Sequence, residues 1–292
     1  MPSQHEKSLL ELDTATVLGM VLAWGALLGA LMLEGGHPRA LLNGPAALLV
    51  FGGTFGAGII SFRMSQLKSL PAVLAQAFTE KSQDIAEVIA LLVGFAERAR
   101  REGLLVLEED LETLTDPFLR RGVQLAIDGT DPELVRDILT TELHFLQARH
   151  RVGESIFTTL GGFAPTLGII GTVVGLIHML SSLSDPGRMG PLIASAFLAT
   201  LYGVASANLL FLPVAKKLRA RSAEEVLVRE VMVEGILSIQ AGDNPRVVEE
   251  KLKAYLAPGA REGLALTSVS ALRHGERSSY ATDDPSQQRY AA

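Results

Sequence analysis

The sequence predicts an all-α integral membrane protein with four transmembrane helices, a large helical cytoplasmic insertion between spans 2 and 3, and a helical cytoplasmic C-terminal segment. Composition is the first reason, because 48% of the 292 residues are hydrophobic and yet 20% are charged. The second is that the stretches 156–180 and 191–213 contain no charged residue. At about 1.5 Å rise per residue, either stretch crosses a hydrocarbon core of about 30 Å. The charges must therefore lie in sizeable aqueous segments.

Two further apolar stretches precede this pair and complete the four spans. Residues 14–33 carry no charge, and residues 46–62 are just long enough to cross a membrane. The first stretch is longer than the apolar region of a secretory signal, and the segment before it is not basic. We therefore expect it to remain in the protein as a transmembrane helix.

Basic residues predict the orientation of the spans, because cytoplasmic flanks carry an excess of Lys and Arg. The two short loops on the opposite side hold only Arg39 and Arg188. The large segments are therefore expected in the cytoplasm. The basic residues that flank the spans on that side are Arg63, Lys68, Arg149, Arg151, Lys216, Lys217, Arg219 and Arg221.

The ends of the spans predict six segments. They are a cytoplasmic N-terminus (1–13), a transmembrane hairpin of spans 1 and 2 (14–62), a cytoplasmic helical domain (63–153), a second hairpin of spans 3 and 4 (154–214), cytoplasmic helices (215–257) and a disordered tail (258–292). The tail has little periodicity and many Ser, Arg, Asp and Gln residues, which is typical of disorder.

Apolar residues recur every three or four positions in the aqueous segments, and this spacing predicts amphipathic helices. It does so in 85–100, 123–127, 134–146 and 224–239, and 246–256 is expected to form a short helix. Pro117 and the cluster 128–132 separate the helices of the insertion. Thr130 or Asp131 is expected to cap the helix that begins at Pro132.

Several classes of function are excluded by composition. The net charge of −6 argues against a nucleic-acid partner, which would require a concentrated basic surface. There is no cysteine, and the six histidines show no metal-ligand spacing, so no metal site is expected. No nucleophile with a base and no phosphate loop appears, so no catalytic residue is assigned and the chain is not expected to be an enzyme.

Four features of the sequence carry a resemblance to a known family. They are APTLGIIGTVVGLI (164–177), ATLYG (199–203), Pro213 near the end of span 4, and EGILSIQAGDNP (234–245). Together with the order of spans and the place of the insertion, they resemble the A-subunits of the flagellar motor stator, the MotA and PomA proteins. The resemblance covers roughly residues 10 to 257.

This resemblance implies a bacterial inner-membrane protein of which five copies surround the transmembrane helices of a B-subunit dimer (MotB or PomB type). Flow of Na⁺ or H⁺ at that interface would drive rotation and torque on the rotor, without a resident cofactor. The residues add a constraint of their own, because none of the four spans contains a carboxylate. A carboxylate in the membrane is expensive, roughly 3 kcal/mol, and is typical of an ion relay. If the chain conducts cations, the titrating acid must therefore come from a partner, in agreement with the family, whose essential aspartate belongs to the B-subunit.

The resemblance points to ion-pathway residues in spans 3 and 4. Thr172 and Thr200 match the threonines of sodium-type stators, and hydroxyl oxygens can help replace the hydration shell of a sodium ion. Their ordinary role would be a bond to their own helix. Pro165 and Pro213 match the family's two prolines, and proline removes an amide donor and kinks a helix. Tyr202 lines the pathway or bonds to a neighbouring helix.

Two further sets of residues are assigned. Gly161, Gly168 and Gly175 repeat at seven residues and, with Gly203 on the next span, predict close helix packing, within the chain or against a partner. Arg100 and Glu108 fit the family's pattern for contact with the rotor switch protein (FliG type). The neighbouring Arg101 and Glu109 leave that register open by one residue, and solvation alone is the ordinary role of such charges.

Three alternatives remain open at this point. The related TolQ and ExbB proteins are ion-driven energisers of the cell envelope, but those resemble three-span proteins, and the extra first hairpin here argues against them. A membrane enzyme would need chemistry that the sequence does not show. A passive membrane scaffold would carry no current with any partner.

Overall fold

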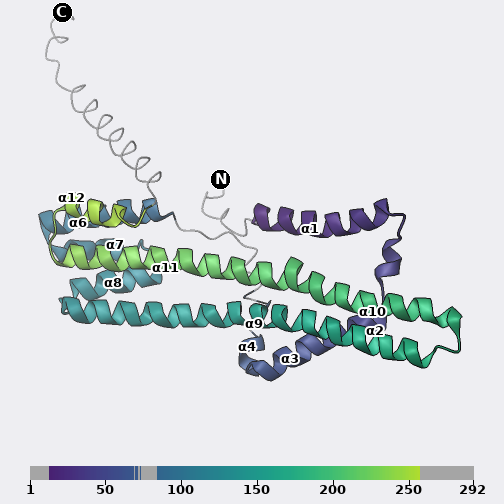
Figure 1. Cartoon of the computed structure of the whole chain (residues 1–292). Coiled ribbons are helices and arrows are strands. Elements are labelled where there is room, and N and C mark those ends of the chain that lie inside the picture. Colours follow the sequence, from purple (N-terminus) through teal and green to yellow (C-terminus); the bar gives the residue numbers. More distant parts are fainter. Residues whose placement is uncertain (1–12, 69, 72, 74–83, 257–292) are drawn as a thin grey trace, which may run out of the picture. The chain divides into compact units, whose positions relative to one another are not determined.

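The computed structural model describes residues 13–68, 70–71, 73 and 84–256, and all regular structure within these ranges is helical (Figure 1). Most of the predicted N-terminal segment (1–13) and all of the predicted disordered tail (258–292) lie outside the described residues. The prediction of four transmembrane helices is confirmed. The helices long and apolar enough to cross a membrane are Thr14–Leu33, Gly44–Ser61, Pro132–Ser181 and Pro186–Gln240.

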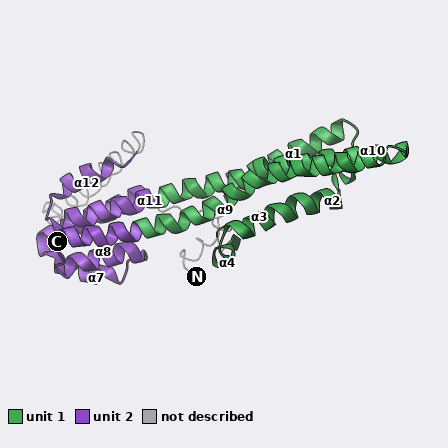
Figure 2. Cartoon of the chain, turned by 60° about the horizontal axis from the view of Figure 1, so that its bottom comes forward, with its two compact units in different colours: residues 1–82, 144–225 green, residues 83–143, 226–292 purple. Residues whose placement is uncertain are grey.

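The chain forms two compact units, which Figure 2 colours separately. Unit 1 comprises residues 1–82 and 144–225, and unit 2 comprises residues 83–143 and 226–292. Two long helices, α9 (Pro132–Ser181) and α11 (Leu212–Gln240), contribute residues to both. The segment borders expected at 153/154 and 214/215 fall inside these continuous helices, so the chain changes from aqueous to apolar composition without a break in its helical structure.

Unit 1 is built mainly from the apolar helices. Its elements are α1 (Thr14–Leu33), η2 (Pro38–Leu41), α2 (Gly44–Ala47), the π-helical η3 (Leu48–Gly52), α3 (Gly53–Ser61), α4 (Met64–Lys68), α10 (Pro186–Ser206), the π-helical η5 (Ala207–Phe211) and parts of α9 and α11. Its larger core cluster joins one face of α9 to η5 and α11. The buried residues of that cluster are Ile156, Phe157, Leu160, Ala164, Ala207, Phe211, Val214, Ala215 and Leu218.

Unit 2 has the core of a water-soluble helical domain. Its elements are α6 (Ile85–Glu102), η4 (Leu104–Leu107), α7 (Glu108–Leu111), α8 (Pro117–Ile127), α12 (Pro245–Lys253) and the remaining parts of α9 and α11. Asp131, one of the two expected caps, starts α9 by accepting a hydrogen bond from the Glu133 amide at 2.9 Å. The largest fully buried side chains are Phe118, Ile89, Leu92, Leu107, Leu119, Leu139, Met232, Ile236 and Leu252.

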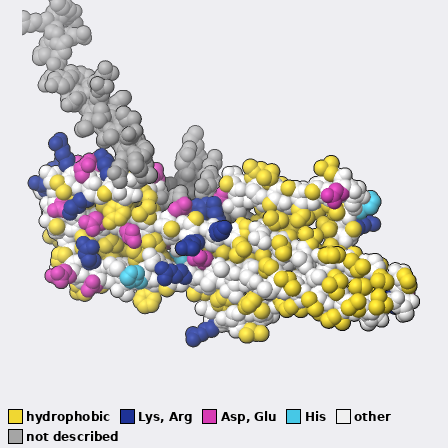
Figure 3. Space-filling view, in the orientation of Figure 1, with side chains coloured by type: hydrophobic (Ala, Val, Ile, Leu, Met, Phe, Trp, Pro, Cys, Tyr) yellow, Lys and Arg dark blue, Asp and Glu magenta, His cyan; other side chains and the backbone are white. Residues whose placement is uncertain are grey.

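The surfaces of the two units differ in composition (Figure 3). Charged side chains crowd the visible face of unit 2, whereas the visible face over α1 and α10 is mainly hydrophobic. Within one chain, the apolar stretch of α1 is left uncovered, with Leu18 69% and Leu22 71% exposed. A helix of this composition is stable in lipid or against other protein.

Candidate functional site

The two threonines singled out in the sequence lie side by side where α9 meets α10. Their hydroxyl groups hydrogen-bond to each other. The Thr172 Oγ1 lies 3.1 Å from the carbonyl oxygens of Gly168 and Ala196, and the Thr200 Oγ1 lies 3.5 Å from that of Gly168. Four neutral oxygen atoms from two helices therefore converge at one point. Because a hydroxyl has one hydrogen and two lone pairs, acceptor capacity remains in this cluster.

Glycines allow the backbones of α9 and α10 to touch beside the threonine pair. A Cβ added at Gly168 would lie 2.9 Å from the carbonyl oxygen of Ala199, and one added at Gly203 would overlap the carbonyl oxygen of Ala164. Neither neighbour is a flexible side chain, so neither can move aside. The other two predicted packing glycines, Gly161 and Gly175, meet the side chain of Leu212 and the Cβ of Ala196. All four therefore serve contacts within the chain.

The two prolines lie at different levels of this helix pair. Pro165 is inside α9, one turn from Gly168, and it leaves the Gly161 carbonyl without its usual helix partner. Pro213 is the second residue of α11 and directly follows Leu212, which faces Gly161. Pro213 has no amide to donate to the carbonyl of Leu209, four residues earlier, and Leu209 lies within η5, where the helix is π-helical. Pro165 therefore lies next to Ala164, whose carbonyl oxygen meets Gly203, and Pro213 lies further along the other helix.

The Tyr202 hydroxyl is engaged by the loop that precedes span 2. It donates a hydrogen bond to the carbonyl oxygen of Leu41 and accepts one from the Asn43 amide at 2.9 Å. The ring stacks on Phe51, with ring centroids 6.0 Å apart. Bonding to a neighbouring helical element, the second of the two expected roles, therefore accounts for this side chain.

Sequence reasoning missed three polar residues around these helices. The Asn43 side chain caps α2 and accepts a hydrogen bond from the Ser195 hydroxyl at 3.2 Å. Its position before Gly44-Pro45 is a recognisable start signal for a helix. Thr54 on α3 is fully buried, and within the described ranges its Oγ1 has no hydrogen-bond partner. Nothing local in the sequence distinguishes Thr54 from an ordinary membrane threonine.

The apolar spans around the threonine oxygens supply no negative charge. The four apolar spans contain no Asp or Glu. Among the described residues, no group of three or more His, Cys, Asp or Glu residues is placed to hold a metal ion. The oxygen cluster can therefore contribute ligands to a passing cation but supplies no counter-charge.

A buried carboxylate ties the start of α1 to α11. The Asp13 side chain is 7% exposed, caps α1 through the amides of Ala15 and Thr16, and forms ion pairs with Lys217 and Arg221. The hydrogen bond from Lys217 is the main reason that the pKa of Asp13 lies well below its usual range. This cluster is the polar anchor of an otherwise uncovered helix.

In unit 2, the structure shows which of the neighbouring charges at the end of α6 and the start of α7 form ion pairs. Arg101 pairs with Glu97 at 3.6 Å, and Glu109 lies 3.9 Å from Arg98. Arg100 and Glu108 are both exposed, and neither forms an ion pair within the described part of the chain. Arg100 and Glu108, the two residues that the motif assigns, therefore carry charges that are not paired within the described residues.

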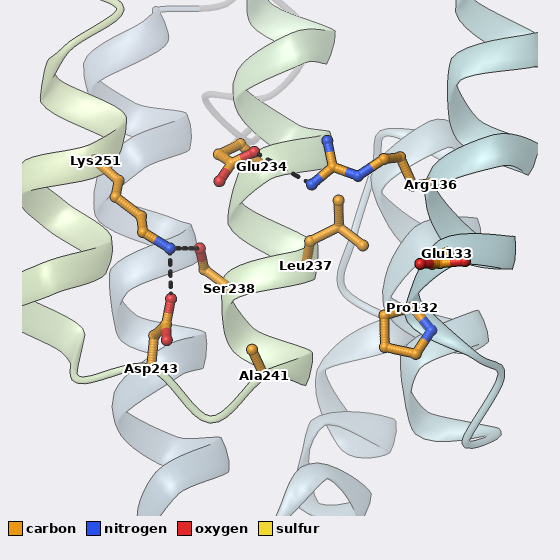
Figure 4. Close-up of a pocket in the computed structure, with 9 residues that line it drawn as sticks. All are labelled: Pro132, Glu133, Arg136, Glu234, Leu237, Ser238, Ala241, Asp243 and Lys251. Atoms are coloured by element: carbon orange, nitrogen blue, oxygen red, sulfur yellow. Dashed lines mark hydrogen bonds and ion pairs between the residues drawn. The ribbon is translucent and has the colours of Figure 1, made fainter.

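The phrase 234–245 builds the joint between α9, α11 and α12 (Figure 4). Glu234 pairs with Arg136 at 3.8 Å, and Lys251 contacts Asp243 at 2.7 Å and the Ser238 hydroxyl at 3.4 Å. These side chains line a hollow of about 300 Å³. The bond from Lys251 lowers the pKa of Asp243, and Asp243 in turn raises the pKa of Lys251. Four of the charged residues that line the hollow, Arg136, Glu234, Asp243 and Lys251, are paired with one another, so these contacts stabilise the fold of unit 2.

Two protein-family models together match most of the described chain. The model of the MotA/TolQ/ExbB proton channel family matches residues 110–231. The model described as Motility protein A N-terminal matches residues 17–103, which include the first hairpin and α6.

Similar proteins agree with these matches. Motility protein A of Bacillus subtilis is 39% identical over 267 residues, covering 91% of this chain and 98% of the relative. Chemotaxis protein PomA of Vibrio alginolyticus is 37% identical over 250 residues, covering 86% and 98%. A chain of the flagellar MotAB stator complex from Bacillus subtilis superposes with a TM-score of 0.81 at 40% identity, covering 87% of this chain and 100% of that one.

Proposed function

The chain belongs to the MotA/TolQ/ExbB proton channel family, as a stator A-subunit of the flagellar motor, and from this premise we propose that it conducts sodium and generates torque with a B-subunit. The main support for the proposal is the hydrogen bond between the hydroxyl groups of Thr172 on α9 and Thr200 on α10. The family is one of ion channels, not enzymes. The match of the first hairpin to the Motility protein A N-terminal model favours a stator over an envelope energiser or a passive scaffold.

The B-subunit supplies the negative charge that the ion needs. The solved structure that this chain resembles is a MotAB complex, and the spans here contain no carboxylate. An aspartate on a B-subunit helix beside the threonine pair would complete a site of one charged and several neutral oxygens. Such a site replaces the hydration shell of sodium, whereas a proton needs only the carboxylate.

Ion passage would proceed from the outer side to the cytoplasm, past the aspartate and the threonine pair, while the ring of A-subunits steps. Each charge that crosses about 100 mV releases roughly 2.3 kcal/mol, so rotation is divided into many small steps. Pro165, next to the glycine contact, gives α9 a point at which it can bend with each step. Pro213 and the π-helical η5 give the other helix a similar point further along.

The exposed apolar faces of α1 and α10 would contact the other members of the assembly. Five copies would cover the apolar faces of α1 and α10 with one another, with B-subunit helices and with lipid of the inner membrane. Basic residues at the ends of the spans support a cytoplasmic position for unit 2. There it would present Arg100 and Glu108 to the rotor switch protein. Exposed charges of this kind mainly steer association and set its register.

Swimming speed tests this proposal directly. A stator-deleted host would carry the chain and its cognate B-subunit, and speed would be measured across a sodium series at fixed pH and with a proton uncoupler. We expect speed to rise with sodium and to resist the uncoupler. Sodium-independent speed that the uncoupler abolishes would make this a proton stator with structural threonines. No motility under any condition would contradict the stator function itself.

A further inference from the structure

The turn between α6 and α7 displays one leucine that the fold of unit 2 does not use. Gly103 ends α6 with a φ of +88°, a conformation that suits glycine, and the chain then enters η4. Leu104 and Val106 pack against the core of unit 2, and Leu107 is fully buried. Leu105, between them, is 71% exposed. Three of the four residues hold the turn in place, and the fourth points outward.

The turn is fixed at its base by an ion pair. The Arg98 Nη1 lies 2.6 and 2.5 Å from the two carboxylate oxygens of Asp110, which ties the last turns of α6 to α7 (Figure 1). The Gly103 amide also donates to the carbonyl oxygen of Ala99 at 2.9 Å. Because the turn is already held in one conformation, a partner that binds it has little chain entropy to remove.

Two unpaired charges flank the exposed leucine. Arg100 lies in the last turn of α6 and Glu108 is the first residue of α7, and neither forms an ion pair within the described ranges. A cation, an apolar side chain and an anion therefore lie close together in the chain, at the end of α6, in η4 and at the start of α7. An apolar centre with a polar rim is the usual composition of a protein interface.

We propose that Leu105 is the apolar anchor of the rotor-contact surface and that the Arg98–Asp110 pair positions it. The partner would offer a shallow apolar depression with an acidic group opposite Arg100 and a basic group opposite Glu108. This inference rests on the proposed function, because it concerns the same contact. It assigns most of the affinity to the leucine, since exposed charge pairs contribute little net energy, and it assigns register and approach to the two charges.

Binding of the assembled complex to its rotor partner tests the proposal. The full chain, co-purified with its B-subunit in detergent micelles, would be titrated with the purified rotor switch protein of the same organism. Leu105→Ser is expected to weaken binding by about tenfold or more, which corresponds to about 1.4 kcal/mol. Leu105→Met, which keeps the apolar volume, should stay within about threefold of the unchanged chain.

A matched control separates this effect from the loss of any surface leucine. Leu134 on α9 is 52% exposed in the same unit, and Leu134→Ser should leave binding of the rotor partner unchanged. Sodium uptake by vesicles that carry the complex should be the same for Leu105→Ser and the unchanged chain, which shows that the channel is intact.

Three results would overturn the proposal. If Leu105→Ser binds normally while Arg100→Ala binds weakly, the contact is electrostatic and the leucine is not its anchor, although the proposed function stands. If Leu105→Ser changes the number of A-subunits in the complex but not rotor binding, the leucine serves a contact between copies. If the unchanged chain conducts no ion and binds no rotor partner, the proposed function fails as well.

Discussion

The two units differ in the side chains that lie between their packed helices. In unit 2, large aliphatic and aromatic side chains such as Leu92, Phe118 and Ile236 fill the space between helices. In unit 1, α9 and α10 meet through glycine, alanine and threonine, with carbonyl oxygens against Cα atoms. The hydrophobic effect stabilises the first arrangement, because packing removes apolar surface from water. Lipid gives no such drive, so close backbone contact and hydrogen bonds hold the second.

The same helix takes part in both arrangements. Near its start, α9 contributes Val135 and Leu139 to the core of unit 2, and towards its end it contributes Gly168 and Thr172 to the contact with α10. The size of the side chain at a contact therefore matters in opposite ways in the two units. Adding atoms should break the contact of α9 with α10, and removing them should weaken the core of unit 2.

The largest effect is expected from Gly203→Ala. The added Cβ would overlap the carbonyl oxygen of Ala164, so α9 and α10 would have to separate and the threonine pair would part. We expect no co-purified complex with the B-subunit and no restored swimming. Gly56→Ala on α3, whose added Cβ has no atom within 4 Å, should behave like the unchanged chain. Normal assembly of Gly203→Ala would show that α9 and α10 can move apart enough to admit a methyl group without loss of the complex.

The converse change in unit 2 is Ile236→Ala, which removes atoms from a fully buried site. The expected loss of stability is about 2–5 kcal/mol, from lost apolar burial and the cavity left behind. Hydrogen exchange of the full chain should show weaker amide protection in α8 and α12, with α10 unchanged. Val247→Ala, at a residue that is 47% exposed, is the control. Equal loss of protection in α10 would mean that the two units do not unfold separately.

Thr200→Val keeps the volume of the side chain and removes one hydroxyl from the oxygen cluster. The cost to helix packing is small, about 0.6 kcal/mol for a typical interhelical hydrogen bond in a membrane. If the hydroxyl also binds sodium, the sodium concentration for half-maximal swimming speed should rise by about tenfold. That rise corresponds to a loss of about 1.4 kcal/mol in the free energy of sodium binding. Thr158→Val, whose hydroxyl bonds only to Glu154 in its own helix, should leave that concentration unchanged. An unaltered sodium dependence of Thr200→Val would assign the threonine to packing alone.

The smallest effect concerns the ion pair of Lys251 and Asp243 in unit 2. Folding lowers the pKa of Asp243 and raises that of Lys251, so the pair stabilises between their unfolded pKa values, from about pH 4 to about pH 10. Stability is lost as pH falls through the lowered pKa of Asp243 or rises through the raised pKa of Lys251. Because both side chains are partly exposed, the contribution is below about 1 kcal/mol.

Lys251→Met isolates this contribution. Its urea unfolding midpoint should lie slightly below that of the unchanged chain at neutral pH, and the difference should shrink as Asp243 becomes protonated at low pH. Lys216→Met, on the exposed side of α11, is the control. A difference that persists at a pH where Asp243 is protonated would attribute the effect to packing of the lysine stem and not to its charge.

Some of the candidate site could be predicted because its signals are local. Pro165, Gly168 and Thr172 stand in one phrase of the sequence, and their small or hydroxyl side chains at helical spacing indicate a packing face. The pairing of Arg101 with Glu97 is also local, because the two residues are four positions apart on α6. The contact of Glu109 with Arg98 joins α7 to α6 and depends on the turn between them. The engagement of Tyr202 by Leu41 and Asn43 joins residues far apart in the chain, which no helical period reports.

The sequence by itself determined that the chain crosses a membrane four times, that its spans carry no carboxylate, and that two of them are rich in small residues. Length, hydropathy and charge are properties of single segments, so they can be read without knowing what a segment touches. Only the tertiary structure decided that Thr172 meets Thr200, that Thr54 is buried without a hydrogen-bond partner in the described part, and that Leu105 is left exposed. Those outcomes depend on the register between helices, which is set by contacts between residues distant in the chain.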